Sequence, residues 1–260
     1  MTDTRPYLII SNDDGYNAPG LAALVSSLST EGYDILVVAP DAPRSGFACS
    51  ITSGAPLTAR HVHSADGLEV YACSGTPVDC VKLALNRLAR RRPDLVIGGI
   101  NHGDNSSVNS HYSGTMGVAT EGALQGIPAV AFSLCDHRAN ADFTPLTPYL
   151  RQIVRHALTT KMPPFTCLNV NFPLRPSFEG VRICRMAHSR WVREIEDDPQ
   201  DGKGNTYRLA GECIELEPEA ADTDRWALAH GFVAITPTTL DNTDYAMLRE
   251  LHAAAFLPDA

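Results

Sequence analysis

The sequence predicts an α/β protein built on a doubly wound, mostly parallel β-sheet. Short continuous apolar runs alternate with segments of helical periodicity over roughly the first 133 residues, and this pattern is typical of parallel strands covered by helices on both faces. Polar, glycine-containing segments follow several of the apolar runs. Ligands bind outside the carboxyl ends of strands in such sheets, so these segments are where function is expected.

The first strand is predicted over residues 7–10, an apolar run of the kind found in buried parallel strands. A helix follows, because Leu21, Leu24, Val25 and Leu28 recur at helical spacing. Further strands are predicted at 34–39, 69–73, 94–97 and 128–132, and further helices at 77–90 and 117–124. Pro77 suits the first turn of its helix, where its missing N–H would have no partner.

After about residue 134 the pattern loosens. A helix is predicted at 149–158, a strand at 166–171, a buried strand at 232–235 and a short helix at 245–255. The charged stretch 190–219 is predicted to be a solvated loop, from which 207–209 and 213–216 protrude as a hairpin. We therefore divide the chain into a catalytic core, residues 1–185, and a C-terminal extension, residues 186–260, that is expected to serve as an oligomerisation arm.

Composition excludes some function classes. The net charge of −9 opposes binding to long nucleic acid, which normally requires a basic surface. Apolar runs stay shorter than the 18 or so residues of a membrane span. The N-terminus has no charged-then-apolar leader, and the seven cysteines are scattered without a C-x-x-C pair. These features predict a cytoplasmic protein with reduced thiols and no membrane partner.

The adjacent carboxylates of Asp13 and Asp14 are the most informative residues of the chain. They follow the first predicted strand, and Gly15 permits the backbone to leave the extended conformation there. Two unpaired carboxylates this close repel, and a shared cation removes that repulsion. The pair therefore predicts a divalent metal site. The alternative is an acidic turn that caps the following helix.

Three further loops are brought to the same edge by the predicted sheet. Residues 39–46 contain Ser45 and Arg44, residues 98–105 contain Asn101 and Asn105, and residues 112–115 lead into a helix. Ser-Gly turns and helix N-caps would explain the first and third loops without a function. As functional groups they supply a hydroxyl, amide oxygens, and free backbone N–H groups at a helix start, where anions bind.

The combined donor set is made of hard oxygens. Carboxylate, hydroxyl and amide oxygens favour Mg²⁺, Mn²⁺ or Ca²⁺ over zinc or copper. Such a cation beside an anion-binding helix start indicates phosphoryl chemistry. The chain lacks the G-x-S-x-G elbow, the P-loop and an early G-x-G-x-x-G, which argues against serine hydrolases, P-loop enzymes and dinucleotide binding. His61 and His63 have no nearby metal-binding partners in sequence and are predicted to lie on the surface.

Several motifs, in order along the chain, resemble the SurE family of stationary-phase survival proteins. The N-terminal matches are Ser-Asn-Asp-Asp-Gly at 11–15, Arg-Ser-Gly at 44–46 and Ser-Gly-Thr-Pro at 74–77. The central matches are Gly-Ile-Asn-x-Gly-x-Asn at 99–105, Tyr-Ser-Gly-Thr at 112–115 and Gly-Ile-Pro at 126–128. Thr-Asp at 223–224 and Ile-Thr-Pro at 235–237 extend the likeness almost to the C-terminus.

The resemblance implies a metal-dependent phosphatase that acts on nucleoside 5′- and 3′-monophosphates, with a Rossmann-like core. It implies one Mg²⁺ or Mn²⁺ per subunit, held by Asp13, Asp14, Ser45 and Asn101, with the two aspartates as the catalytic residues. It further implies that the phosphate is held by Asn101, Asn105, Ser113, Gly114 and Thr115. A homodimer or homotetramer with exchanged C-terminal arms is also implied.

Three positions depart from the family pattern, none of them a proposed ligand. Pro43 replaces a usual Asn, Ser107 a usual Gly and Thr238 a usual Leu. The group that protonates the leaving alkoxide is left open between His111 and an ordered water.

Two alternative functions are weighed beside the nucleotidase. A haloacid-dehalogenase-type phosphatase requires Asp-x-Asp and a catalytic lysine, which adjacent aspartates and only three lysines oppose. A non-catalytic module that senses metal and nucleotide would carry the same site without turnover.

Overall fold

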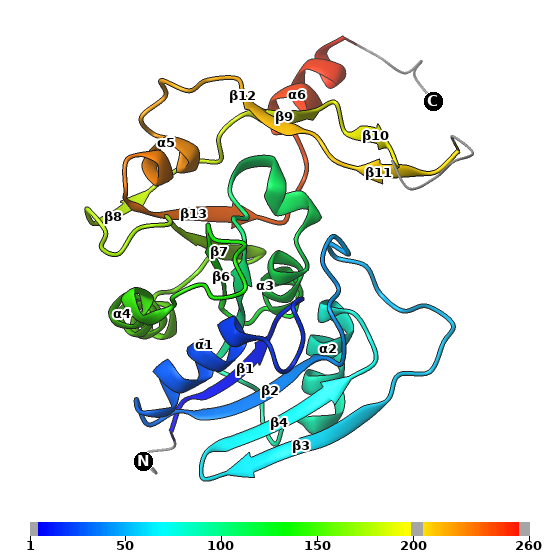
Figure 1. The fold of residues 1–260 in the computed structure, drawn as a ribbon, viewed down its shortest axis with the longest axis vertical. Coiled ribbons are helices and arrows are strands. Elements are labelled where there is room, and N and C mark those ends of the chain that lie inside the picture. Colours follow the sequence, from blue (N-terminus) through cyan, green and yellow to red (C-terminus); the bar gives the residue numbers. More distant parts are fainter. Residues whose placement is uncertain (1–4, 199–204, 255–260) are drawn as a thin grey trace.

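The computed structural model describes residues 5–198 and 205–254. Its centre is a nine-stranded sheet in the order β3-β4-β2-β1-β5-β6-β7-β13-β8 (Figure 1). The six strands from β4 to β7 in this order are all parallel to one another. Their bounds are β4 (Leu68–Cys73), β2 (Asp34–Pro40), β1 (Tyr7–Ser11), β5 (Leu95–His102), β6 (Ala129–Leu134) and β7 (Thr166–Phe172). The α/β fold with a mostly parallel sheet is confirmed.

The strand order reverses between β1 and β5. From β1 the chain builds outward through β2 to β4, and it then returns to the other side of β1 to add β5, β6 and β7. This reversal separates the loops that leave the carboxyl ends of β1 and β5, and the resulting crevice is where open α/β sheets bind ligands. The segments that contain Asp13 and Asn101 lie at this point.

Helices cover both faces of the sheet, as Figure 1 shows. Helices α1 (Pro19–Ser29) and α4 (Thr147–Thr159) lie on one face, and α2 (Pro77–Leu83) and α3 (Gly114–Leu124) on the other. Side chains alternate along β1, so Leu8 and Ile10 belong to the first core and Tyr7 and Ile9 to the second. A π-helical turn, η1 (Ala84–Leu88), continues α2.

Two differences from the predicted strands concern β3 (Ala59–Ala65) and β5. Strand β3 pairs antiparallel with β4 at the sheet edge, and all seven of its residues are exposed. It therefore has no buried apolar face whose pattern could predict a strand from the sequence. His61 and His63 lie on it and are exposed, as predicted. Strand β5 does not end at Ile97 but continues to His102, with a shift of register between Gly98 and Asn101. Glycines that indicate a loop in the sequence are here part of a buried, irregular strand.

One strand of the C-terminal segment joins the central sheet, and the helices on either side of that strand lie outside the sheet. Strand β13 (Val233–Thr239) lies between β7 and β8 (Val181–Ile183), antiparallel to β7. The division of the chain at residue 185 stays a prediction. Helix α5 (Asp224–Ala229) precedes β13, and α6 (Tyr245–Ala253) follows it and has no buried residue. Residue 255 of the predicted last helix lies outside the described residues.

Four short strands form an antiparallel ribbon above the carboxyl edge of the sheet (Figure 1). Here β9 (Ser189–Val192) pairs with β12 (Glu212–Glu215), and β10 (Ile195–Asp197) pairs with β11 (Tyr207–Leu209). The segments 207–209 and 213–216 therefore do not pair with each other. Each pairs with part of the stretch predicted as loop, because exposed strands are specified by hydrogen bonds that periodicity does not report.

The remaining elements are short. They are the 3₁₀ turns η2 (Ser107–Tyr112), which leads into α3, and η3 (Thr144–Leu146), which leads into α4. No helix within the described residues combines the length and the apolar character needed to cross a membrane.

Candidate active site at the carboxyl edge of the sheet

Asp13 lies just past the end of β1 and is almost completely buried, with 3% of its surface exposed. Its carboxylate accepts a hydrogen bond of 2.5 Å from the Thr115 hydroxyl and one of 3.2 Å from the Gly114 amide. Both donors belong to the first turn of α3, which packs against β5 and β6. Only glycine fits at 114, because a Cβ there would lie 2.8 Å from Asp13 Cβ. The start of α3 therefore fixes the carboxylate.

Asp14 contacts the end of β5, the strand that pairs with β1. Its Oδ2 accepts a hydrogen bond of 3.3 Å from the backbone N–H of His102, at the end of β5. The strand ends at Ser11, and the next residues form a bend closed by Asn12, whose side chain bonds both the N–H and the carbonyl of Gly15. Gly15 has φ +106°, a conformation that L side chains rarely adopt. The expected break in the extended backbone is present, and it begins at Asn12, one residue before Asp13.

Burial raises the pKa of Asp13 to about 6, and the neighbouring charge of Asp14 acts in the same direction. The hydrogen bond from Thr115 opposes this shift because it favours the charged form. The pKa of Asp14 is also raised, again chiefly by burial. Two crowded carboxylates with unfavourable burial are a fitting environment for a cation, whose charge would stabilise both anions.

Ser45 lies in the turn after β2 and is exposed. The preceding residue holds this turn against the site, because the backbone N–H of Arg44 donates to the carbonyl of Asp13 over 2.7 Å. The Arg44 guanidinium donates to the carbonyl of Ser74 over 3.0 Å and lies 3.5 Å from Asp41. Arg44 therefore anchors the loop and leaves the Ser45 hydroxyl at the rim of the site.

Asn101 occupies the irregular end of β5. Its side-chain nitrogen donates to the carbonyl of Gly103 over 2.8 Å, so its amide oxygen is the atom available to a ligand. The glycines before it permit tight packing: a Cβ at Gly98 would lie 2.4 Å from the Thr115 carbonyl, and one at Gly99 the same distance from the Phe132 carbonyl. Bulkier residues would push β5 away from α3 and β6.

Asn105 is buried in a ladder of asparagines at the ends of neighbouring strands. Its backbone N–H donates to Asn171 and its side-chain nitrogen to Ser133, both over 2.8 Å. Asn169 donates to the carbonyl of Asn105, also over 2.8 Å. The side-chain nitrogen of Asn105 is thus used within the protein, and its amide oxygen remains.

The residues of the first turn of α3 that are predicted to contact phosphate already form hydrogen bonds within the protein. Ser113 is the N-cap, and its hydroxyl accepts a hydrogen bond of 3.0 Å from the Met116 amide. Gly114 and Thr115 donate to Asp13. The capping alternative and the anion-site prediction describe the same geometry here, and the role of these residues toward phosphate stays a prediction. Thr76 makes an N-cap with a capping box before α2.

A single cavity of about 740 Å³ joins most of these residues. Of the predicted site residues, Asp13, Ser45, Asn101, Asn105 and Ser113 line it. Gly114 and Thr115 lie behind Asp13, and Asp14 lies at the side of β5. The other lining residues are Gly46, His102, Gly103, Asp104, Asn109, Tyr112, His137, Trp191, Glu194, Leu209, Ala210 and Gly211.

Sequence reasoning missed the two histidines of this cavity. His137 follows β6, so the strand-end argument that selected the other loops would have found it. Its ring lies against Gly103, where a Cβ would come within 2.2 Å of Cε1. His102 adjoins Asn101, and its Nε2 is buried without a hydrogen-bond partner among the described residues. His111, the residue considered as a proton donor, is exposed and is not among the lining residues.

The residues present fit a divalent cation that prefers oxygen. Within residues 5–198 and 205–254, no three His, Cys, Asp or Glu side chains cluster as a metal site. A cation held by Asp13 and Asp14 would thus need neutral oxygens, which Asn101 and Ser45 can supply. Such a donor set suits Mg²⁺ or Mn²⁺ and is unsuited to zinc.

Lysine positions bear on the haloacid-dehalogenase alternative. Lys82 pairs with Glu121 of α3 at 2.8 Å, Lys161 lines a different cavity, and Lys203 lies outside the described residues. None of the lysines described is placed to act with Asp13.

Comparison with known proteins identifies the family of the chain. The family model for the survival protein SurE matches residues 8–193. The 5′-nucleotidase SurE of Bacteroides fragilis is 51% identical over 251 residues, which cover 96% of this chain and 98% of that protein. The 5′-nucleotidase SurE of Cytophaga hutchinsonii is 42% identical and covers 96% of each chain.

A solved structure extends the agreement to three dimensions. The crystal structure of the SurE protein from Aquifex aeolicus has 35% sequence identity and a TM-score of 0.78, and the match covers 96% of this chain and 99% of that one. With a matching family model over most of its length, relatives about half identical from end to end, and the same fold, this chain belongs to the SurE family.

Proposed function

We propose that this protein is a 5′-nucleotidase that uses a divalent metal ion to hydrolyse nucleoside monophosphates to nucleoside and phosphate, with 3′-monophosphates as additional substrates. The name of its relatives supports the reaction. The observation that carries the proposal is the convergence of Asp13, Asn101 and Ser113 on one cavity at the reversal point of the sheet. Hard-oxygen ligands and a helix start at one crevice are what phosphoryl transfer requires.

The side chains have distinct tasks in this proposal. Asp13, Asp14, Asn101 and Ser45 hold Mg²⁺ or Mn²⁺. A bound cation supplies positive charge to the phosphoryl oxygens and makes nearby water a better nucleophile. Neither aspartate is a nucleophile.

The protein's own structure orients these groups before substrate arrives. Thr115 and Gly114 fix Asp13, and the N–H of His102 fixes Asp14. The N-terminus of α3 favours the negative phosphate through its partial positive charge. Asn101 and Asn105 offer their amide oxygens at the same cavity.

His102 and His137 are the imidazoles that line the cavity, and we propose that one of them protonates the leaving alkoxide. Single His→Gln variants would distinguish the two. The proton donor is expected to lose turnover on AMP while it keeps turnover on p-nitrophenyl phosphate, whose leaving group needs no proton. Equal losses on both substrates would exclude the tested histidine.

The test of the proposed function is phosphate release from AMP by the purified protein. We expect release with Mn²⁺ or Mg²⁺ and its loss with EDTA, with recovery when the metal is restored. Activity that survives chelation would contradict the metal dependence. Tight binding of AMP in Mn²⁺ without any phosphate release would favour a sensing module in place of an enzyme.

A further inference from the structure

The cavity is much larger than a phosphate group requires. Its volume of about 740 Å³ lies within the range of sites that enclose a whole small molecule. The carboxyl edge of the sheet supplies carboxylate and amide oxygens that suit a cation, and the start of α3 suits a phosphate. The ribbon supplies a different chemistry, because Trp191 of β9 and Leu209 of β11 line the same cavity. A ligand with a charged end and an apolar, flat end would match both parts.

The side chain of Trp191 can stack on a ligand but has no free hydrogen-bond donor to offer it. Its indole N–H already donates to the side-chain oxygen of Asn109 in η2, over 2.9 Å. The polar atom of the ring is therefore satisfied within the protein, and what Trp191 can offer a ligand in the cavity is its apolar ring surface. Fixing the ring before binding also lowers the entropy cost of stacking a ligand on it.

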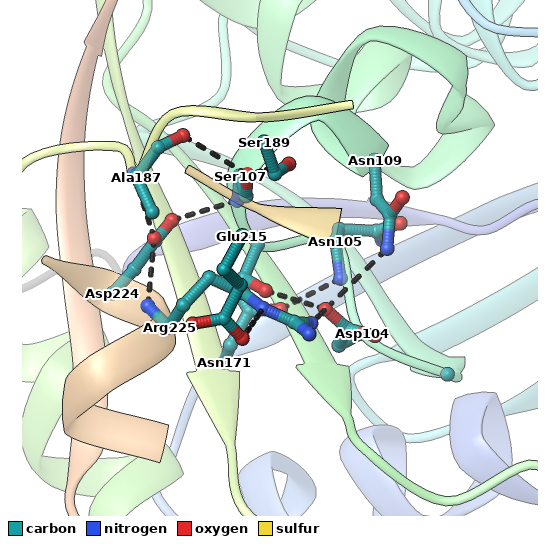
Figure 2. Close-up of polar contacts among 12 residues, drawn as sticks. Asp104, Asn105, Ser107, Asn109, Asn171, Ala187, Ser189, Glu215, Asp224 and Arg225 are labelled. Carbon is teal, nitrogen blue, oxygen red and sulfur yellow. Dashed lines mark hydrogen bonds and ion pairs between the residues drawn. The ribbon is translucent and has the colours of Figure 1, made fainter. Parts of the chain in front are cut away.

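The ribbon and η2 are held together by a polar network, which Figure 2 shows. Asp224 is completely buried and accepts hydrogen bonds from the backbone of Ser107, over 2.8 Å, and of Ala187, over 2.9 Å. Ser107 adds a hydrogen bond of 2.9 Å to the Ala187 carbonyl and a contact with Ser189. Ser107 has φ +54°, the left-handed conformation expected where the family usually has glycine. The strand that contains Trp191 thus begins at a fixed point.

Two ion pairs of Arg225 position Asp104 beside the side chain of Asn109. Arg225 bridges Glu215 of β12, over 3.0 Å, and Asp104, over 3.2 Å. Asp104 in turn lies 3.5 Å from the side-chain nitrogen of Asn109. Both ends of the Asn109 amide are therefore engaged, one by Asp104 and one by Trp191 (Figure 2 draws the Asp104 side).

We infer that Trp191 is the nucleobase-stacking residue of this cavity and makes the protein prefer purine over pyrimidine nucleotides. This inference deepens the proposed function and rests on it. Stacking on an aromatic ring accepts any base, and it is stronger for the larger purine ring system. Because the indole N–H is already bonded, adenine and guanine are not distinguished by Trp191.

The kinetic test compares AMP, CMP and ribose 5-phosphate, which is the same substrate without a base. Trp191→Ala is expected to raise KM for AMP about tenfold, the usual effect of removing a base-stacking ring. Its KM for ribose 5-phosphate should change less than twofold, and its advantage for AMP over CMP should disappear. Trp191→Phe should recover most of the AMP affinity. An equal rise in KM for AMP and ribose 5-phosphate would overturn the inference and assign Trp191 a structural role.

Fluorescence supplies a readout that does not require turnover. The chain has two tryptophans, and Trp226 stacks on His230 with ring centroids 3.7 Å apart and does not line the cavity. The Trp226→Phe variant therefore reports on Trp191 alone, and Trp191→Phe is the matched control. In Mg²⁺, a non-hydrolysable phosphonate analogue of AMP should quench the first variant and not the second. Inorganic phosphate should quench neither.

The two hypotheses fail in different ways. No phosphate release from any substrate would contradict the proposed function, and the quenching experiment would still decide the role of Trp191. Phosphate release from AMP and ribose 5-phosphate with no quenching in the Trp226→Phe variant would overturn the role of Trp191 alone.

Discussion

The carboxyl edge of the sheet and the antiparallel ribbon line the same cavity, but different interactions hold them in place. All five residues of β1 are buried, and the side chains that follow it are fixed by helix and strand neighbours. All residues of β10 and β11 are exposed, and the ribbon joins the core through polar contacts at Asp224 and Arg225.

This difference suggests a division of labour between chemistry and selectivity. The buried edge can hold charged groups in one geometry, as chemistry on a phosphate requires. Residues of the ribbon can be substituted without disturbing the hydrophobic core. We therefore expect substitutions at the edge to act on turnover, and substitutions in the ribbon to act on substrate affinity.

The largest effect is expected from Asp13→Asn, which keeps the size of the side chain and removes a charge from the proposed cation site. Phosphate release from AMP should fall by about 10²–10³-fold or more, comparable to the loss of a principal electrostatic group in an active site. Steady-state kinetics with Mn²⁺ would measure it, and circular dichroism would check the fold. A fall of less than tenfold would move the chemistry away from Asp13.

A smaller loss is expected from Gly114→Ala, because the new Cβ would lie 2.8 Å from Asp13 Cβ and displace the carboxylate. Turnover should fall by about 100-fold, since small misplacements of catalytic groups are costly. Gly122→Ala is the matched control on the same helix, where the Cβ would lie 2.7 Å from Val96 Cβ.

Both glycine variants should lose about 1–3 kcal/mol of unfolding free energy from overpacking. Only Gly114→Ala should lose activity beyond that explained by its folded fraction. Equal activity in the two variants would show that the position of Asp13 is not critical.

At the ribbon, Asp224→Ala should act on affinity and stability. It leaves the buried N–H groups of Ser107 and Ala187 without their acceptor, which costs about 2 kcal/mol. KM for AMP should rise while kcat stays within about threefold. Asp222→Ala is the control, since its ion pair with Arg185 is exposed to solvent and contributes little to stability. A loss of kcat with unchanged KM would contradict the division of labour.

The smallest effect is expected at the sheet edge far from both regions. His61 and His63 lie on the exposed strand β3, and the ring of His61 makes an edge contact with the ring of Tyr71. Replacing both with Ala should change stability by less than about 0.5 kcal/mol and leave Mn²⁺ affinity unchanged. Thermal unfolding and metal titration would measure these; weaker metal binding would reveal a second site.

The sequence predicts the buried edge well because burial leaves a pattern. The parallel strands appear as continuous apolar runs, and polar residues placed after them fall together at one edge, as Asp13 and Asn101 do. His137 obeys the same rule after β6, but without a second pair of metal ligands nearby its segment is interpreted from the sequence as a loop. The extension of β5 through Gly98 was not predictable, since glycine indicates a loop unless its packing against α3 is known.

The ribbon could not be predicted in the same way. Its strands are exposed, so no hydrophobic period distinguishes them from a charged loop. The contacts that place Trp191 join residues 82 positions apart in the chain, and those of Asp224 join it to Ser107 across 117 positions. Such pairs follow from the folded sheet and leave no local signal. The part of the cavity nearest the proposed chemistry was therefore identified from sequence, and the part nearest the proposed nucleobase was not.

The most direct test of the central claim is calorimetric titration of the metal-free protein with Mn²⁺, compared between the unaltered protein and Asp13→Asn. If Asp13 and Asp14 are two ligands of one cation, the unaltered protein binds one Mn²⁺ per chain and the variant binds it at least about tenfold more weakly. Equal affinity in the two proteins would contradict the assignment of the cation to this edge of the sheet.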